Sequence, residues 1–200
     1  MTIGVIDYGA GNMRSVTNAL DALALVGRVV ASAGDLDRCS RVILPGVGHF
    51  APAARRLADT GLDDALRAAV ERGVPLLGVC LGAQLLLAGS AEAPDVPGLG
   101  IINGSCDRLT TTTVPHMGWN AVTPRSGAGL FDVNGDPAYF YFAHSFVCKP
   151  EDPAVVAADT ECDGQRFCVA LERGRVFGVQ FHPEKSAQAG LDLLQRFATC

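Results

Sequence analysis

The sequence predicts an α/β fold with a mostly parallel central sheet, helices on both faces of that sheet, and a smaller antiparallel part in the second half. Strand and helix patterns alternate through the first half, whereas short strands and turns follow from Gly98 onward. Glycine-rich turns also come directly after several first-half strands. Such alternation is typical of parallel sheets covered by helices. A length of 200 residues suits one domain, residues 1–200, with a core of its own.

The first half contains short apolar runs that predict buried strands, namely TIGVID (2–7), RVVAS (28–32), RVILP (41–45) and VPLLGV (74–79).

Helical patterns follow three of these runs. Apolar side chains recur at helical spacing over 12–25 and over 53–72, where Gly61 marks a potential break. LGAQLLLAG, from Leu81, predicts another helix. The turns YGAGN, PGVGHF and VCLGAQ all follow strands. Because ligands of parallel sheets bind at the carboxyl ends of strands, we expect the site at this edge.

The second half is expected to consist mainly of short strands. They are GLGII (98–102), YFYFAHSF (139–146), FCVALERG (167–174) and RVFGVQFH (175–182). The last two predict a hairpin that turns at Arg173 and Gly174. Ser186 is expected to cap a final helix that ends near Phe197. The polar run 110–113 predicts a loop or an edge strand.

Composition argues against several classes of protein. The net charge of −5 and the lack of a Lys/Arg cluster disfavour a nucleic-acid binder. No apolar stretch reaches membrane-spanning length, and MTIGVIDYGAG at the N-terminus does not resemble a signal peptide. Seven cysteines, an odd number, without a CxxC pair argue against a disulfide framework or a structural zinc site. We therefore expect a cytoplasmic protein without a bound metal.

Cys80 is the strongest candidate for chemistry. It lies between Gly78 and Gly82 at a predicted strand-to-helix corner, the arrangement of a nucleophile elbow. The small neighbours permit strained backbone angles, and the helix N-terminus favours a thiolate. His182 and Glu184 follow about a hundred residues later as a base and a carboxylate that can orient it. We expect the other cysteines to be small buried apolar residues without a role in chemistry, namely Cys39, Cys106, Cys148, Cys162, Cys168 and Cys200.

The chain resembles the class I, triad-type glutamine amidotransferases. The family motifs are PGVG (45–48), GVCLGAQ (78–84) and FGVQFHPE (177–184), in the family's order. Within this family the chain resembles the glutaminase subunits of imidazole glycerol phosphate synthases, from histidine biosynthesis. That narrower likeness is carried by DYGAGNMRSV near the start, PHMGWN (115–120), YFAHSF (141–146) and HPEKS (182–186).

The resemblance implies a hydrolytic reaction on glutamine. Cys80 would attack the side-chain amide carbonyl, and His182 would take the thiol proton and later protonate the departing ammonia. Glu184 would hold the imidazole and stabilise its cation. Water would then hydrolyse the glutamyl thioester to glutamate. Nucleophilic catalysis of this kind needs no cofactor.

The resemblance also implies donors for the oxyanion. One is the backbone N–H of Leu81, and the other comes from Gly46 or Val47 in the PGVG loop, whose glycines permit a peptide flip. Without the rest of the chain, PGVG would be interpreted only as a tight turn.

The amino-acid end of the substrate has its own expected partners. Gln84 and Glu92 are placed by the resemblance near the α-amino and α-carboxylate groups. Ser145 and Phe146 would receive the carboxylate through their N–H groups. Glu92 lies in the turn-rich SAEAPDVPG, where a solvated acid is the default interpretation.

Four further residues are expected on a docking face. The resemblance places Asn12, Trp119, Tyr141 and Lys185 against a synthase subunit of (β/α)₈-barrel type, in a heterodimer, beside an ammonia exit. The alternatives are a core tryptophan and an ordinary surface lysine. Small departures from the family pattern, such as phenylalanine at 146 where tyrosine is frequent, remove no catalytic group.

Other functions stay open at this point. The chain could be another class I glutaminase, of the anthranilate, guanylate or pyridoxal-phosphate synthase type, which PHMGWN and HPEKS disfavour. It could be a degenerate subunit that docks without chemistry, which the intact cysteine, histidine and glutamate oppose. A lone hydrolase of γ-glutamyl peptides is a third alternative.

Overall fold

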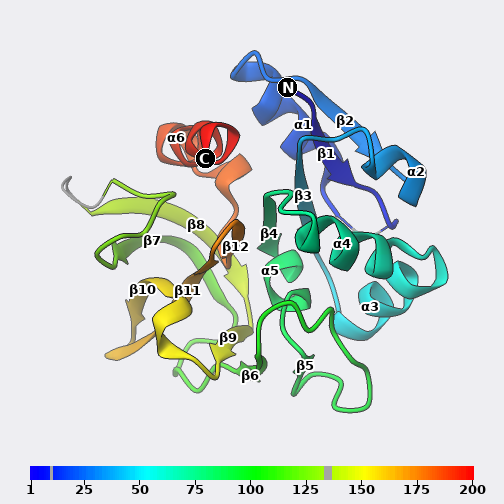
Figure 1. The fold of residues 1–200 in the computed structure, drawn as a ribbon. Coiled ribbons are helices and arrows are strands. Elements are labelled where there is room, and N and C mark those ends of the chain that lie inside the picture. The colour runs from blue at the N-terminus through cyan, green and yellow to red at the C-terminus, as the bar shows by residue number, and fades with distance from the viewer. Residues whose placement is uncertain (10, 133–136) are drawn as a thin grey trace.

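The computed structural model of the chain describes residues 1–9, 11–132 and 137–200. Within these residues a nine-stranded sheet has the order β2-β1-β3-β4-β12-β11-β10-β7-β8, and a three-stranded sheet has the order β5-β6-β9 (Figure 1). The strands are β1 (Ile3–Ile6), β2 (Gly27–Val30), β3 (Arg41–Gly46), β4 (Leu76–Cys80), β5 (Gly89–Ser90), β6 (Gly104–Arg108), β7 (His116–Pro124), β8 (Ala138–His144), β9 (Phe146–Pro150), β10 (Val156–Cys162), β11 (Gln165–Arg173) and β12 (Val176–Val179).

The helices are α1 (Met13–Ala22), α2 (Ala33–Leu36), α3 (Phe50–Asp59), α4 (Leu62–Glu71), α5 (Leu81–Leu85) and α6 (Ala187–Thr199), with 3₁₀ turns η1 (Pro153–Val155) and η2 (Pro183–Lys185).

The large sheet changes character along its width. Neighbouring strands from β2 to β12 are parallel, and those from β12 to β8 are antiparallel. The predicted α/β class with a parallel part and an antiparallel part is therefore confirmed. The antiparallel strands, however, continue the same sheet across β12, and only β5, β6 and β9 form a separate one.

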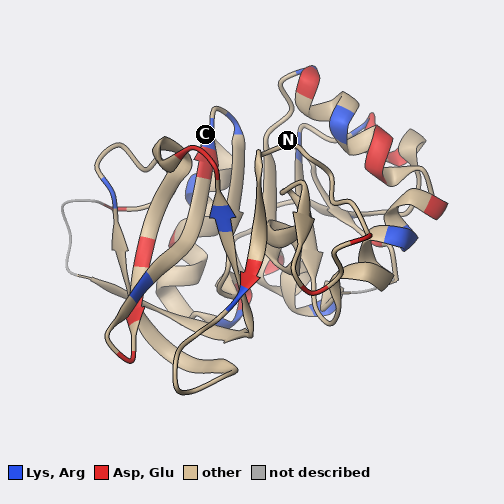
Figure 2. Cartoon of the chain, turned by 90° about the horizontal axis from the view of Figure 1, so that it is seen from below, with Lys and Arg blue, Asp and Glu red and all other residues tan. Residues whose placement is uncertain are grey.

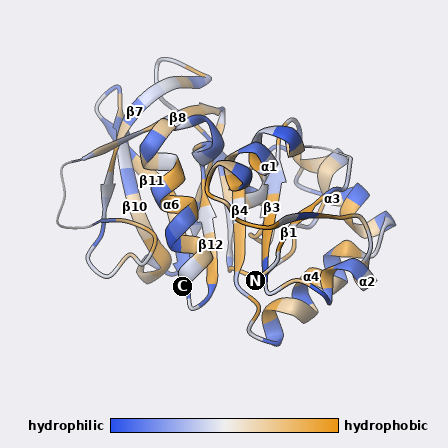
Figure 3. Cartoon of the chain, turned by 90° about the horizontal axis from the view of Figure 1, so that it is seen from above, coloured by the Kyte–Doolittle hydropathy of each residue, from blue (hydrophilic) through white to orange (hydrophobic). Residues whose placement is uncertain are grey.

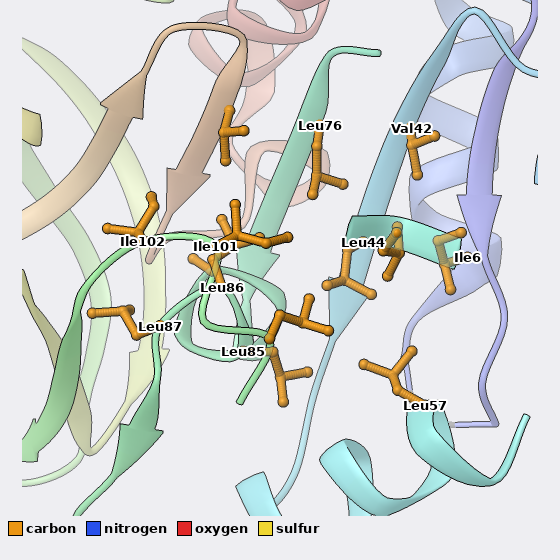
Figure 4. Packing of buried hydrophobic residues seen from close by; sticks show 14 of the residues in the cluster. Ile6, Val42, Leu44, Leu57, Leu76, Leu85, Leu86, Leu87, Ile101 and Ile102 are labelled. Carbon is orange, nitrogen blue, oxygen red and sulfur yellow. The ribbon is translucent and has the colours of Figure 1, made fainter. Parts of the chain in front are cut away.

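Helices cover both faces of the parallel part. One apolar cluster joins the sheet to α3, α4 and α5, through residues such as Leu57, Leu66 and Leu85. A second cluster joins the opposite face to α1 and α6, for example through Leu20 and Phe197. Figure 3 shows the hydrophobic strands β3 and β4 between these helices, and Figure 4 shows the first cluster from close by.

Local sequence accounts for the helix boundaries. Gly61 has a left-handed φ of 67°, so α3 ends and α4 begins there, as predicted. Helix α1 starts after Asn12, whose side chain accepts a hydrogen bond from Ser15 N at 3.3 Å.

Two sequence predictions in the middle of the chain are wrong. The helix after Cys80 ends at Leu85, well before the end of LGAQLLLAG. GLGII is not a strand, because its backbone N–H groups bond to the carbonyls left free where α5 ends. Examples are Leu99 N to Leu85 O at 2.8 Å and Ile102 N to Leu86 O at 3.0 Å. This segment therefore acts as a cap on α5.

Two predictions near the C-terminus need correction. The hairpin of β11 and β12 forms, but it turns at Gly174 and Arg175, one residue later than predicted. Ser186 stands at the N-cap position of α6, yet its side chain makes no capping bond. Its hydroxyl donates to His182 O at 2.6 Å and accepts from Tyr141 N at 2.9 Å. Ser186 therefore ties the HPEKS segment to β8.

The surface carries no dominant charge. Figure 2 shows Lys and Arg interspersed with Asp and Glu along the strands and helices. Among the described residues, no helix is long and apolar enough to cross a membrane.

Candidate active site

Cys80 stands on a strained turn between β4 and α5. Its φ of 53° and ψ of −110° are unusual for a residue with a side chain. The flanking glycines are required by close packing. A Cβ at Gly82 would overlap the carbonyl oxygen of Leu44, and one at Gly78 would lie 2.6 Å from Gly82 O. The nucleophile elbow predicted from the sequence is thus present in the backbone geometry.

His182 stands three residues after the end of β12, the strand beside β4. Its backbone N–H donates to Tyr141 O at 2.9 Å, and its Nδ1 lies 2.9 Å from Glu184 Oε1. Both side chains of this ion pair are only 3% exposed. Since a carboxylate accepts, Nδ1–H donates to Glu184 and leaves Nε2 for the thiol. The parallel pairing of β4 and β12 therefore brings Cys80 close to a histidine and a glutamate that follow about a hundred residues later in the chain.

Opposing effects act on the imidazole. Burial by itself lowers the pKa of His182, but hydrogen bonds with Cys80 and Glu184 outweigh it and raise the pKa to about 9. The Oε2 atom of Glu184 is buried and has no hydrogen-bond partner among the described residues. The carboxylate of Glu184 therefore stabilises a cationic imidazole through Oε1 alone.

A cleft of about 600 Å³ opens over Cys80. Its lining includes predicted site residues from three parts of the chain, namely Cys80, Leu81, Gln84, Glu92, Ser145 and Phe146. Arg108 and His49, which the sequence analysis did not single out, also line it. The cleft has room for an amino acid, with Cys80 in its wall.

Gln84 is buried and already engaged. Its Nε2 donates to Phe146 O at 3.2 Å and to Gln180 Oε1 at 3.1 Å. Gln180 in turn places its own Nε2 3.7 Å from Cys80 Sγ. Sequence reasoning missed Gln180, although it stands in the quoted motif FGVQFHPE. The signal was a polar residue between apolar neighbours in the predicted strand 175–182, one position beyond the observed end of β12.

Glu92 lines the cleft but also holds a neighbouring loop. Its Oε1 lies 2.7 Å from His49 Nδ1, and its Oε2 accepts from Phe50 N at 2.9 Å. The carboxylate thus binds the start of α3, where the helix dipole favours a negative charge. The sequence suggested either a contact with the substrate or a solvated acid, and the bond to the start of α3 is neither of these. Glu92 also lines the cleft, so its position still permits contact with a ligand.

The PGVG loop lies beside the elbow. Gly46 pairs with Cys80 in the β3–β4 register, and a Cβ on it would lie 2.6 Å from the Tyr8 hydroxyl and 2.8 Å from Leu81 Cβ. The Tyr8 hydroxyl donates to Pro45 O at 3.0 Å. Within this loop, Gly46 is therefore closely packed, whereas Val47 is 39% exposed and Gly48 lines the cleft.

The start of β9 presents backbone groups to the cleft. Leu109 N donates to Ser145 O at 2.9 Å, and Arg108 is the register partner of Phe146. By the alternation of an antiparallel ladder, Arg108 and Phe146 are then a non-hydrogen-bonded pair. Both backbone groups of Phe146 therefore point away from β6, toward α5. Its carbonyl meets Gln84 there, and its N–H lies on the same side.

The predicted docking residues fall into two places. Trp119 and Tyr141 are cross-strand partners with ring centroids 6.2 Å apart, and Lys185 Nζ lies 5.7 Å from the Tyr141 ring centre. Trp119 is 54% exposed, so it is not a core tryptophan. Asn12 is on the neighbouring element, where its side chain caps α1. The first three thus form one exposed aromatic and basic patch.

The thiols and acidic groups show no metal-binding arrangement. All seven cysteines are free. In the part of the chain that the structure describes, no group of three or more His, Cys, Asp or Glu side chains could hold a metal ion.

Comparisons with known proteins agree with this geometry. The family profile of glutamine amidotransferase class-I matches residues 4–199. The chain is 44% identical over 196 residues to "Imidazole glycerol phosphate synthase subunit HisH" of Chlorobaculum tepidum, covering 97% of this chain and 98% of that protein. It is 48% identical over 197 residues to the protein of the same name from Moorella thermoacetica, covering 98% and 93%.

Two further similarities concern a longer protein and a solved structure. The chain is 42% identical to "Imidazole glycerol phosphate synthase hisHF, chloroplastic" of Arabidopsis thaliana, covering 98% of this chain and 33% of that protein. A crystal structure of a glutamine amidotransferase superposes with a TM-score of 0.78 and covers 98% of each chain at 22% identity. At that identity the superposition shows the fold alone.

Proposed function

The chain belongs to the class I glutamine amidotransferase family, and we propose that it is the glutaminase subunit of an imidazole glycerol phosphate synthase in histidine biosynthesis. It hydrolyses glutamine to glutamate and ammonia, and the ammonia is used by a synthase partner. Near-full-length identity of 44 and 48% to proteins of that name supports the assignment. The observation that carries the chemistry is Cys80 on its strained turn, beside the buried His182–Glu184 pair.

The proposed reaction uses these three side chains in turn. Cys80 Sγ attacks the carboxamide carbon of glutamine while its proton passes to His182 Nε2. The imidazolium, supported by Glu184, gives that proton to the departing nitrogen, and ammonia leaves a glutamyl thioester. His182 then takes a proton from water, which attacks the thioester and releases glutamate and the thiol.

The oxyanion and the substrate backbone are assigned to neighbouring groups. Leu81 N–H follows the nucleophile, and Gly46 or Val47 supplies the second donor when the PGVG loop adopts the suitable peptide orientation. The α-carboxylate of glutamine binds the N–H groups of Ser145 and Phe146. Gln84 supports this end through its bond to Phe146 O, and Glu92 faces it across the cleft.

We further propose the mode of assembly. A chain that joins this segment to a further one in Arabidopsis thaliana supports a tightly coupled synthase partner. The partner is a (β/α)₈ barrel that forms a heterodimer with this chain and carries any lyase step. It docks on the patch of Trp119, Tyr141 and Lys185, with Asn12 at the rim. Residues 1–200 act as one domain without a cofactor, and a reducing cytoplasm suits the essential thiol.

Regulation follows from the loop. If one peptide orientation of PGVG presents a carbonyl to the reaction centre and the other an N–H, the first repels the oxyanion. Losing one such donor slows catalysis by roughly two to three orders of magnitude. A partner that favours the active orientation by about 2.7 kcal/mol would activate the chain ~100-fold.

The test is steady-state glutamate release from glutamine by the free chain, by the complex with the cyclase subunit, and by the complex with the synthase ligand. We expect a low rate for the free chain and the highest rate for the liganded complex. Absence of glutamate in all three would contradict the function, and equal rates would contradict only the loop mechanism. A docking module without chemistry would bind the partner and release none.

A further inference from the structure

A chain of buried hydrogen bonds joins β7 to the start of β9. Asn120 Nδ2 lies 3.1 Å from His116 Nε2, His116 Nδ1 lies 2.9 Å from His144 Nε2, and His144 Nδ1 lies 2.9 Å from Phe146 O. His116 and His144 are only 6% and 5% exposed. Neither histidine takes part in the reaction described above.

Only one arrangement of protons satisfies this chain. The Phe146 carbonyl can only accept, so His144 Nδ1–H donates to it and its Nε2 must accept. His116 Nδ1–H then donates to His144, and its own Nε2 accepts from the amide of Asn120. The second N–H of that amide donates to Glu161 O at 2.9 Å, while the Asn120 carbonyl accepts from Ala121 N at 2.8 Å. The relay is therefore directional, and both rings are neutral.

Burial agrees with neutral rings. It lowers the pKa of His116, and it lowers the pKa of His144 to about 3, where the neighbouring His116 and His182 act in the same direction. Below their ordinary range, these pKa values keep both imidazoles uncharged at neutral pH. A single protonation would replace an acceptor with a donor and break the relay.

The relay ends on an atom that matters for substrate. Phe146 O receives two hydrogen bonds, one from His144 and one from Gln84 Nε2 at 3.2 Å. Two donors from different elements hold that carbonyl in one orientation. Because the N–H of Phe146 lies on the same side of the strand, its direction into the cleft is held as well.

We propose that His116 and His144 are positioning residues that hold the Phe146 backbone ready for the α-carboxylate of glutamine, with Asn120 as the anchor on β7. This inference rests on the proposed function of the cleft. The anchor Asn120 directly follows Trp119 in β7, and its side chain points to the opposite face of the strand.

Packing is the competing explanation. The His116 ring centre lies 4.6 Å from that of Phe142 and 5.7 Å from that of Phe167, so both histidines also fill an aromatic cluster. A phenylalanine would fill the same space without any hydrogen bond. Phe142 offers the matched control, because it packs on both imidazoles and donates nothing.

The experiment compares His144→Phe, His144→Asn and Phe142→Leu in the complex of the full chain with its synthase partner. Loss of the donor in His144→Phe should raise KM for glutamine about 3- to 10-fold and change kcat less than about 2-fold. His144→Asn keeps a donor near the Nδ1 position and should recover KM to within about 2-fold. Phe142→Leu should lower stability and leave KM unchanged. An unchanged KM in His144→Phe, or an equal rise in Phe142→Leu, would overturn the proposal.

A second readout does not depend on activity. Nitrogen-15 NMR of the free full chain at neutral pH should find His144 and His116 both protonated at Nδ1 and unprotonated at Nε2, with the signals assigned from His144→Phe and His116→Phe. An Nε2–H tautomer at His144 would refute the relay. If the wild-type complex releases no glutamate, the proposed function fails, and the tautomers still report on the relay.

Discussion

His182 holds a charge that its surroundings would not favour without two partners. Burial disfavours the imidazolium, whereas hydrogen bonds with Cys80 and Glu184 favour it, and the pKa rises to about 9. In the proposed reaction, a pKa above the ordinary range would let the imidazole keep the thiol proton until ammonia departs. The linkage also makes a prediction for stability.

Glu184→Gln should destabilise the protein more at low pH than at high pH. A raised folded-state pKa contributes stability that is complete below the ordinary pKa of 6.5 and is lost as the pH rises through about 9. Loss of the carboxylate lowers that pKa, so we expect a cost of roughly 1–3 kcal/mol at pH 6 and a smaller one at pH 9.5. Urea unfolding at both pH values measures this.

The control is Glu151→Gln, which changes an exposed carboxylate just after the end of β9. Its cost should be small and the same at both pH values. A pH-independent cost in Glu184→Gln would show that the carboxylate does not stabilise an imidazolium.

At the scale of elements, the elbow depends on the close approach of α5 to β3. A Cβ on Gly82 would overlap Leu44 O, and the atom it meets belongs to the backbone, which cannot rotate away. Leu44 in β3 and Gly82 in α5 are both buried. The glycine is therefore required by packing as well as by the turn.

Gly82→Ala should lower the free energy of unfolding by about 3 kcal/mol or prevent folding, because backbone must move in a close-packed region. Gly34→Ala is the matched control, since a Cβ there has no heavy atom within 4 Å and lies in α2. We expect it to be neutral or slightly stabilising. Denaturant midpoints measure both. An unchanged midpoint in Gly82→Ala would contradict the packing argument.

Much of the secondary structure in the first half of the chain could be predicted from the sequence, because local patterns determine it. The four early strands, the break at Gly61 and the corner at Cys80 follow from apolar periodicity and glycine. GLGII could not be predicted, since its hydrogen bonds go to the distant end of α5. The roles of Gln180, His116 and His144 could not be predicted from the sequence for a similar reason. Gln180 bonds to Gln84 and Cys80, 96 and 100 residues away, and His116 bonds to His144, 28 residues away on another strand, which no spacing rule reveals.

At the scale of the whole molecule, the antiparallel strands carry an exposed surface. Trp119 and Tyr139 are 54% and 59% exposed, and β7 and β8 place Trp119 beside Tyr141. Exposed tryptophan and tyrosine side chains are typical of the centre of an interface. Strand β8 of this surface leads directly into β9, whose first residue, Phe146, belongs to the proposed substrate-binding backbone.

Trp119→Ala should weaken binding of the synthase partner about 10- to 100-fold, because a large aromatic side chain is a frequent centre of binding energy. Val29→Ala, an exposed apolar residue on the outer strand β2, is the control and should not change the affinity. Titration calorimetry with the cyclase subunit measures both. Equal affinities for Trp119→Ala and the wild type would place the docking surface elsewhere.

The central claim is that Cys80 is the nucleophile of a glutaminase. The most direct measurement is glutamate release from glutamine by the complex of the synthase partner with the wild-type chain, with Cys80→Ser, and with Cys162→Ser, whose thiol lies at the end of β10. We expect Cys80→Ser to lose at least about a thousandfold in rate while it still binds the partner, and Cys162→Ser to stay within about twofold of the wild type. Glutamate release by Cys80→Ser near the wild-type rate would contradict the account.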